Sequence, residues 1–270
     1  MCLITLSWQP AHKTPLIIAA NRDEFYARPA QPLQHWPGQR ILAGKDMLAG
    51  GTWLGLAKNG STSPVSPVQG AGCVRLAALT NYRDPSRHSP DAPSRGRITT
   101  TFLQGSISAA AYLQELSSKA HLYNPFNLIL FDGQQLMGFE SRHARAFELP
   151  IGISSVSNAD FNTPWPKLVR LQQDFEKALA TKHGTNDPHL DNELLRLLSN
   201  DAIAPDAELP QTGVAFDKER ALSAVFVRAP DYGTRASSVV TLGPHGADVT
   251  ERSFDAHGFA AEVKEHLSFG

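Results

Sequence analysis

Apolar residues in the first two-thirds of the chain come in short runs separated by turn-forming residues, a pattern typical of strands. Residues 2–8 and 16–20 form two such runs, and the polar break between them predicts a hairpin with a long turn. A second hairpin is predicted from the runs 126–132 and 135–140. Further strands are expected at residues 52–58 and 74–80.

The later part of the chain carries helical signals. Ser106 precedes an Ala- and Leu-rich stretch at 106–120, and Pro164 and Pro166 stand at the start of a second stretch at 165–182. A third helix is expected at 189–199, strands at 223–228, 237–242 and 247–254, and a short C-terminal helix at 258–267. Two blocks of strands with helices between and after them predict an α+β fold with a mainly antiparallel sheet system.

The chain is predicted to form one domain that spans residues 1–270. This length is sufficient for a sizeable core, and no internal repeat is evident. The stretch 61–72 is rich in Ser, Pro and Gly, and we expect it to be a loop within the domain rather than a linker between domains.

Composition and charge exclude several classes of function. Hydrophobic residues make up 41% and charged residues 19% of the chain, which is ordinary for a soluble globular protein. The formal net charge is −1 and no run of Lys and Arg exceeds two residues, so no nucleic-acid or membrane-surface binding is predicted. With only two cysteines, no secretory signal and no transmembrane segment, the sequence predicts a cytoplasmic protein.

Sequence motifs for metal, haem and nucleotide sites are absent. The chain has 10 histidines, but it contains no HxxxH, no CxxC and no CxxCH, so no metal site is expected. It also contains no GxSxG, no P-loop and no GxGxxG. The glycine-rich stretch 50–55 precedes a strand, so it is interpreted as a tight turn with a buried Trp53 rather than a phosphate-binding loop.

Cys2 follows the initiator methionine directly. A small residue at this position lets the methionine be removed, which leaves a thiol and a free α-amino group on one residue. The amine titrates near about 7.7–8.0 and the thiol near about 8.5, so at neutral pH the amine can act as base for the thiol. Cys2 is therefore a candidate N-terminal nucleophile of a hydrolase.

Four further candidate site residues stand in polar clusters at the ends of strand-like runs, where side chains can converge above a sheet. Asp23 is interpreted either as a turn-forming acid or as an acceptor for the α-ammonium group of Cys2. Asn81 and Asn158 either bond turn backbone or donate their amides to an oxyanion, a role worth about 3–4 kcal/mol where such donors have been removed. Arg235 is either a clamp for a substrate carboxylate or a salt-bridged surface arginine.

Arg22 and Glu24 alternate with Asp23 along the predicted strand. Side chains alternate between the two faces of a strand, so we expect Arg22 and Glu24 to point away from the face of Asp23. They are interpreted as part of a structural ion-pair network, in which Arg28 is a further partner for Glu24.

Six ordered motifs follow the Met-Cys start of the chain. They are Asn-Arg-Asp-Glu-Phe at 21–25, Gly-Gly-Thr-Trp-Leu-Gly at 50–55, Leu-Thr-Asn-Tyr-Arg at 79–83, Phe-Asn-Leu at 126–128, Ser-Asn at 157–158 with Thr-Pro-Trp-Pro-Lys at 163–167, and Tyr-Gly-Thr-Arg at 232–235. On these motifs nearly the whole chain resembles the NRDE family, also called the transport and Golgi organisation protein family.

That family is in turn similar to the N-terminal-nucleophile hydrolases, in particular the choloylglycine group of bile-salt and penicillin V acylases. The resemblance implies a four-layer αββα sandwich, in which two antiparallel sheets pack face to face with helices outside. It also implies site roles for five residues. Cys2 corresponds to the nucleophile, Asp23 to an aspartate at the end of the second strand, Asn81 and Asn158 to the asparagines around the oxyanion, and Arg235 to a late arginine.

Two departures from the acylases affect the predicted site. The acylases carry an arginine three residues before the aspartate, where this chain has Ala20. We take Arg22 to be out of phase with that position, so that it does not simply replace this arginine beside Cys2. The loop 61–72 looks longer than in relatives and is expected to cover part of the site, with Cys73 at its end.

Three functions compete on these observations. The first is a cysteine hydrolase that needs no cofactor and acts on a linear amide or thioester of a small or lipid-like molecule. The second is a non-catalytic protein that binds or carries haem or a lipid-like ligand, with a histidine or the Cys2 thiolate as axial ligand of the haem iron. The third is a scaffold. The chemistry of Cys2 together with two asparagines favours the first.

Overall fold

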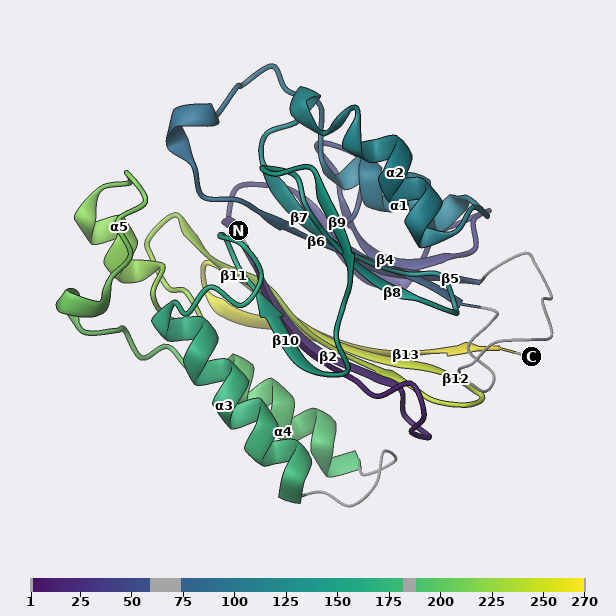
Figure 1. The fold of residues 1–270 in the computed structure, drawn as a ribbon. Helices are drawn as coiled ribbons and strands as arrows, with labels where there is room; N and C mark the ends of the chain where they lie inside the picture. Colours follow the sequence, from purple (N-terminus) through teal and green to yellow (C-terminus); the bar gives the residue numbers. More distant parts are fainter. Residues whose placement is uncertain (1, 59–73, 182–187, 270) are drawn as a thin grey trace.

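The computed structural model describes residues 2–58, 74–181 and 188–269, which form two antiparallel sheets (Figure 1). The first is six-stranded, in the order β10-β1-β2-β11-β12-β13. Its strands, in that order, are Gly152–Val156, Cys2–Trp8, Leu16–Phe25, Tyr232–Leu242, Gly246–Asp255 and Gly258–Ser268. Strand β1 therefore lies inside this sheet, between β10 and β2.

The second sheet is seven-stranded and follows the chain order from β3 to β9. Its strands are β3 (Ala30–His35), β4 (Ile41–Asp46), β5 (Leu54–Lys58), β6 (Val74–Asn81), β7 (Phe126–Phe131), β8 (Leu136–Glu140) and β9 (Arg145–Glu148). The α-helices are α1 (Gly96–Gln104), α2 (Ala109–Ser117), α3 (Pro166–Thr181), α4 (Pro188–Leu198) and α5 (Phe216–Ala221). Short 3-10 turns lie at Pro85–Arg87, Ala120–Leu122 and Asp206–Glu208.

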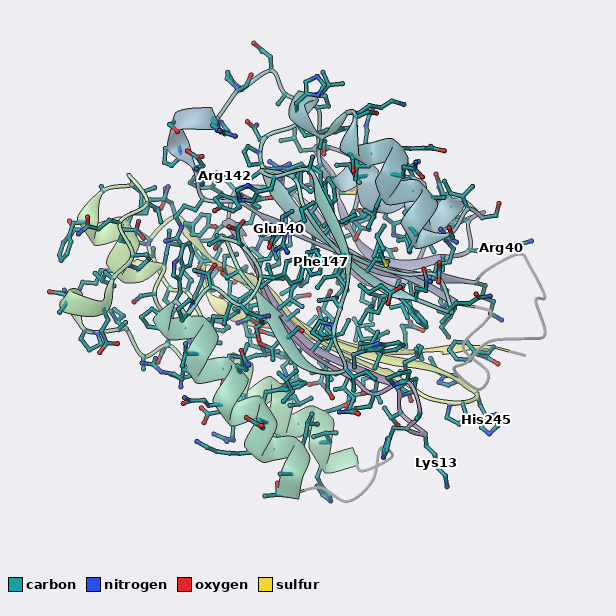
Figure 2. The ribbon with its side chains drawn as sticks, in the orientation of Figure 1. Lys13, Arg40, Glu140, Arg142, Phe147 and His245 are labelled. Carbon is teal, nitrogen blue, oxygen red and sulfur yellow. The ribbon has the colours of Figure 1, made fainter. Side chains whose placement is uncertain are left out.

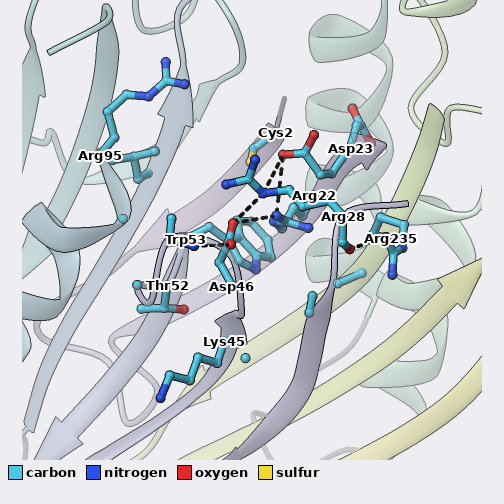
Figure 3. A pocket seen from close by; sticks show the side chains of 18 of the residues that line it. Cys2, Arg22, Asp23, Arg28, Lys45, Asp46, Thr52, Trp53, Arg95 and Arg235 are labelled. Carbon is cyan, nitrogen blue, oxygen red and sulfur yellow. Dashed lines mark hydrogen bonds and ion pairs between the residues drawn. The ribbon is translucent and has the colours of Figure 1, made fainter. Parts of the chain in front are cut away.

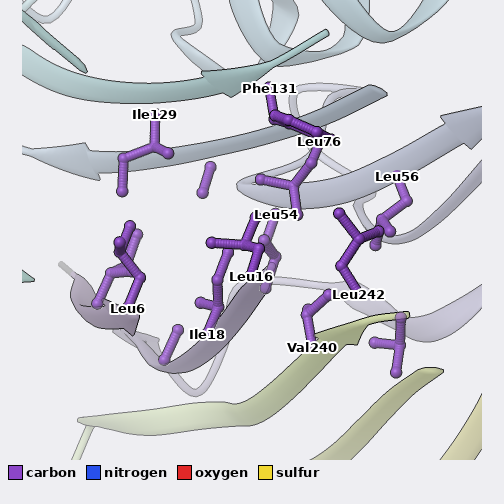
Figure 4. Packing of buried hydrophobic residues seen from close by; sticks show 14 of the residues in the cluster. Leu6, Leu16, Ile18, Leu54, Leu56, Leu76, Ile129, Phe131, Val240 and Leu242 are labelled. Carbon is purple, nitrogen blue, oxygen red and sulfur yellow. The ribbon is translucent and has the colours of Figure 1, made fainter. Parts of the chain in front are cut away.

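The two sheets face each other, and helices cover their outer sides (Figure 1). Helices α1 and α2 pack on the seven-stranded sheet, and α3 and α4 pack on the six-stranded sheet. Side chains fill the layer between the sheets (Figure 2), where leucine, isoleucine and valine residues of both sheets form one buried cluster (Figure 4). The predicted α+β fold with two face-to-face antiparallel sheets is confirmed.

The alternation of side chains along β1 and β2 divides the core into two layers. Ile4 and Ile18 point into the cluster between the sheets, whereas Leu3, Ile17 and Ala19 pack against α3 and α4. Both faces are buried, which explains why these strands read as nearly continuous apolar runs. Each fully buried leucine or isoleucine contributes about 1.5–3 kcal/mol to folding, so both strands are firmly held.

Several predicted elements are confirmed with small changes in their ends. The hairpins of β1 with β2 and of β7 with β8 are present, and β2 continues to Phe25, beyond the predicted 16–20. Helix α2 begins later than predicted, because Ser108 rather than Ser106 caps it by accepting a hydrogen bond from the Ala111 N–H. The predicted loop 61–72 and Cys73 lie outside the described residues.

The predicted C-terminal helix at 258–267 is wrong. These residues form β13, which pairs with β12 along its whole length. The turn before it ends at Gly258, whose φ of +110° suits glycine and directs the chain back along β12. Val263 and Leu267 then reach the cluster between the sheets.

The predicted strand at 223–228 is also wrong, apart from one isolated bridge at Arg228. The backbone groups of this segment are bonded by side chains and loops instead of a neighbouring strand. The Asn21 amide donates to the Val225 carbonyl, and the Phe226 N–H donates to the Asn200 carbonyl. Strands β3, β4, β9 and β10 and helices α1 and α5 were not predicted.

The turn at 50–53 crosses the start of α1 with almost no space between the two backbones. A β-carbon on Gly51 would overlap the carbonyl group of Gly96, and the Thr99 hydroxyl donates to the Thr52 carbonyl at 2.5 Å. Because backbone rather than a flexible side chain blocks the space, we expect Gly51→Ala to lower the free energy of unfolding by about 1–3 kcal/mol.

Urea denaturation checks this expectation, with Gly243→Ala as the matched control. A β-carbon on Gly243 would meet only the Gly246 carbonyl oxygen, at 3.6 Å, which is ordinary contact. We expect the control to change stability by less than about 0.5 kcal/mol. Equal effects of the two substitutions would show that the crossing is not tight in solution.

Candidate functional site

A cavity of about 590 Å³ opens where β1 begins and β2 ends (Figure 3). Cys2 and Arg22 line it from the six-stranded sheet, Asn81 from the end of β6, and Arg95 from the start of α1. Arg235 lines it from β11. The cavity therefore brings together residues that are far apart in the sequence, including four of the five predicted site residues: Cys2, Asp23, Asn81 and Arg235.

Cys2 is the first residue of β1 and is directly opposite Arg22 of β2 in the antiparallel register. Residues that are directly opposite share a face, so the arginine side chain lies beside the cysteine on the side of the cavity (Figure 3). Ala20 is on this face too, because it is two residues from Arg22. The interpretation that Arg22 is out of phase with position 20 was therefore wrong.

The Cys2 thiol is buried, and its surroundings favour the protonated form. Burial raises the pKa of the thiol to about 11, although the positive charges of the amino terminus and Arg22 act to lower it. The negative charges of Asp23 and Glu24 act to raise it further. At neutral pH a nucleophilic Cys2 therefore needs a base that takes its proton.

An ion-pair network flanks Cys2 on the cavity wall. The Arg22 guanidinium lies 3.6 Å from the Glu24 carboxylate and 3.5 Å from the Asp46 carboxylate, and Arg28 lies 2.7 Å from Asp46. Burial acts to raise the pKa of Asp46, but hydrogen bonds from Arg28 and the Ala49 N–H and the charges of both arginines lower it overall. The predicted network of Arg22, Glu24 and Arg28 is confirmed, and Asp46 is its unpredicted fourth member.

Asp23 alternates with Arg22 along β2, so its side chain starts from the opposite face of the strand, although the residue also lines the cavity. Its Oδ1 atom accepts a hydrogen bond of 2.8 Å from the Thr234 hydroxyl, and its backbone carbonyl accepts one of 3.0 Å from the Tyr232 hydroxyl. Asp23 follows the Cys2–Arg22 pair by one residue, so it is level with the backbone nitrogen of Cys2.

The two predicted asparagines occupy different positions. Asn81 ends β6 and lines the cavity with Cys2, and its side-chain amide makes no hydrogen bond within the part of the chain that the structure describes. Asn158 is completely buried and donates its amide to the Asn81 carbonyl at 2.8 Å. Ser157 beside it donates to the Cys2 carbonyl at 3.1 Å. The Ser157–Asn158 turn thus ties the first residue of β1 to the end of β6.

Arg235 holds a loop in addition to lining the cavity. Its Nη1 atom donates to the carbonyls of Phe25, Tyr26 and Arg28 at 2.9–3.1 Å, and its Nε atom donates to the Phe254 carbonyl. Burial lowers the pKa of its guanidinium. These bonds fix the chain that follows β2, so the orientation of Arg28 depends on Arg235.

Sequence reasoning missed a buried charged cluster behind the Asp23 side of the sheet. Arg83 and Glu219 form an ion pair of 2.5 Å with side chains that are 4% and 5% exposed, and Lys167 is buried near them. Arg83 and Lys167 both belong to motifs that carried the family resemblance, which was the available signal. Glu219, in the short helix α5, had no comparable signal.

Two further groups were also missed at the cavity itself. Arg95 lines it and donates to the Pro125 carbonyl at 3.1 Å, and Lys45 lies over the Trp36 ring. Burial lowers the pKa of Arg95. Within residues 2–58, 74–181 and 188–269, no three histidine, cysteine, aspartate or glutamate side chains are grouped as metal ligands would be.

Comparison with known proteins identifies relatives over almost the whole chain. Residues 1–256 match the family described as Transport and Golgi organisation 2. The chain is 36% identical to the Transport and Golgi organization protein 2 homolog of Bos taurus, over 94% of this chain and 93% of the relative. The Homo sapiens homolog is 34% identical with the same coverage, and the Drosophila melanogaster protein is 26% identical over 90% of this chain and 88% of the relative.

Of the helices in the described residues, none is both long enough and apolar enough to cross a bilayer.

Proposed function

The chain belongs to the Transport and Golgi organisation 2 family, and on that premise we propose that it is an N-terminal cysteine hydrolase that cleaves a linear amide or thioester of a small molecule. The family predicted from the motifs is confirmed by these relatives. The observation that carries the proposal is the position of Cys2, which begins a central strand and lines a cavity with Arg22 and Asn81.

The reaction begins with removal of Met1, which frees the α-amino group of Cys2. The amine takes the thiol proton, and the thiolate forms a bond to the carbonyl carbon of the substrate. The carbonyl oxygen becomes an oxyanion, for which the side-chain amide of Asn81, a residue that lines the cavity with Cys2, is a candidate donor. Arg22 stabilises the thiolate by its charge, since it lies on the same face of the sheet.

The second half of the reaction returns the enzyme to its starting form. The ammonium group of Cys2 gives its proton to the leaving amine or thiol as the carbon–nitrogen or carbon–sulfur bond breaks. Water then attacks the acyl-cysteine, releases a carboxylic acid and regenerates the thiol. Asn158 is a less direct candidate as oxyanion donor, because its amide already donates to the Asn81 carbonyl. In this proposal it orients the end of β6.

Haem binding is a weaker candidate for this cavity. Cys2 and His88 line it, and either residue can ligate haem iron. However, the wall beside Cys2 carries two arginines and two carboxylates in one ion-pair network, which does not fit the apolar face of a porphyrin. The charged lining also favours a polar small molecule over a purely hydrocarbon ligand.

Intact mass and alkylation of the untagged protein test the proposal. We expect the mass to show loss of Met1, and a Cys73→Ser variant, which keeps Cys2 as its one cysteine, to react with iodoacetamide at a rate that rises with pH. The matched control is the same variant with an N-terminal extension, in which Cys2 has no free amine and should react more slowly. Retention of Met1, or equal rates in the two forms, would exclude an N-terminal nucleophile.

A further inference from the structure

Lys167 is the second residue of α3, and its side chain is only 1% exposed. Burial of an ammonium group is costly unless an opposite charge offsets it. The start of a helix carries the positive end of the helix dipole, which adds a second unfavourable contribution for a lysine there. Because both burial and the helix dipole disfavour the ammonium group, we expect a negatively charged group near Lys167 to compensate its charge.

The Lys167 ammonium group makes no hydrogen bond to any residue that the structure describes. Its helix is anchored by Leu168 and Leu171, which pack against Leu3 of β1 on the outer face of the six-stranded sheet. Asp23 is on this same face of the sheet, because it is two residues from Asn21, which is opposite Leu3 in the register of β1 and β2. A buried donor without a protein partner is rare, so this group requires an explanation beyond packing.

Ionisable groups from four other segments of the chain act on the charge of Lys167. Burial lowers its pKa to about 8, and the Asp23 carboxylate of β2 is the strongest influence that raises it. Arg83, which follows β6, lowers the pKa, whereas Cys2 of β1 and Glu219 of α5 raise it. Since Arg83 and Glu219 are already paired with each other, Asp23 is the principal counter-charge for Lys167.

Asp23 lies between Lys167 and the start of β1, where Cys2 is located. The Thr234 hydroxyl fixes one of its oxygens, and its position one residue beyond the Cys2–Arg22 pair sets it level with the Cys2 nitrogen. We propose that Lys167 is a positioning residue whose buried ammonium group orients the Asp23 carboxylate at the start of β1 and supplies positive charge that favours the Cys2 thiolate. The link to Cys2 rests on the proposed function, whereas the link to Asp23 does not.

The first test measures the link to Asp23 without any reference to catalysis. The ¹³Cε resonance of Lys167, in protein labelled at lysine and assigned by its absence in Lys167→Met, reports the protonation of this side chain. We expect it to titrate near pH 8 in the original chain and at least one pH unit lower in Asp23→Asn, because the main counter-charge is lost. An unchanged titration in Asp23→Asn would overturn the pairing.

The second test measures the link to Cys2 by its alkylation rate from pH 6 to 9 in the Cys73→Ser background. We expect Lys167→Met to slow labelling about tenfold at pH 7, since a nearby positive charge is lost. Lys167→Arg keeps the charge and should restore the rate, and its profile should lack the flattening near pH 8 that loss of the lysine proton causes.

The outcomes of the two tests separate the two proposals. A folded Lys167→Met variant with an unchanged pH profile would show that Lys167 is only structural. If Asp23→Asn does not fold, the comparison of Lys167→Met with Lys167→Arg still decides the matter, because a merely structural lysine would show no difference in pH profile between them. Retention of Met1 would remove the proposed hydrolase, but the ¹³C titration would still confirm or reject the Lys167–Asp23 pair.

Discussion

Replacing Cys2 by alanine is expected to lower turnover about 10³-fold or more while the protein remains folded. The residue is 4% exposed at the edge of the core, and alanine removes only the sulfur atom, so the loss of packing is small. Alanine also permits removal of Met1, so the α-amino group stays in place and only the nucleophile is lost. The rate is measured as thiolate release from thiophenol thioesters of short acids that carry a polar group.

Serine at position 2 is the matched control for this result. Cys2→Ser keeps a hydroxyl group and the free amine, but serine is a much weaker nucleophile at neutral pH. We expect it to retain a small activity above that of Cys2→Ala. Full activity of the folded Cys2→Ala variant on any thioester that the original chain cleaves would show that Cys2 is not the nucleophile.

The strands next to the site could be predicted because burial dominates their sequence. Cys2–Trp8 and residues 16–20 of β2 are enclosed by apolar layers on both faces, so their apolar runs stand out. Strand Ala30–His35 could not be recognised in this way. It is exposed at the edge of its sheet and contains Pro32, which an edge strand tolerates because one side of its backbone needs no partner.

The C-terminal segment shows why local pattern can mislead. Residues 258–267 are rich in helix-forming Ala, Glu and Lys, and Val263 and Leu267 are four positions apart. Four is one helical turn, but it is also an even number, so both residues share a face in a strand as well. These residues form a strand because they pair with β12, and this pairing is visible only in the tertiary structure.

The site could be predicted in its residue types more fully than in its geometry. Motif positions singled out Cys2, Asp23, Asn81 and Arg235, and all four line the cavity. The face of Arg22 was misjudged relative to Ala20, an error that counting in steps of two along the strand would have prevented. Asp46 and Lys167 could not be assigned in advance, because their partners come from other strands and helices.

The buried charged cluster behind the site supports the largest stability effect that we expect in this protein. The Arg83 guanidinium pairs with Glu219 at 2.5 Å and lies 4.8 Å from the centre of the Trp165 ring. The other Glu219 oxygen accepts hydrogen bonds from the N–H and hydroxyl groups of Thr212. Arg83→Met leaves the Glu219 charge buried and uncompensated, so we expect the free energy of unfolding to fall by about 3–5 kcal/mol.

Removal of both charges should be less harmful than removal of one. We expect the double variant Arg83→Met with Glu219→Gln to recover at least half of the loss, because the neutral amide can still accept the hydrogen bonds from Thr212. Urea denaturation midpoints of the two single variants, the double variant and the original chain give this comparison. If the losses of the single variants simply add in the double variant, Arg83 and Glu219 do not stabilise each other.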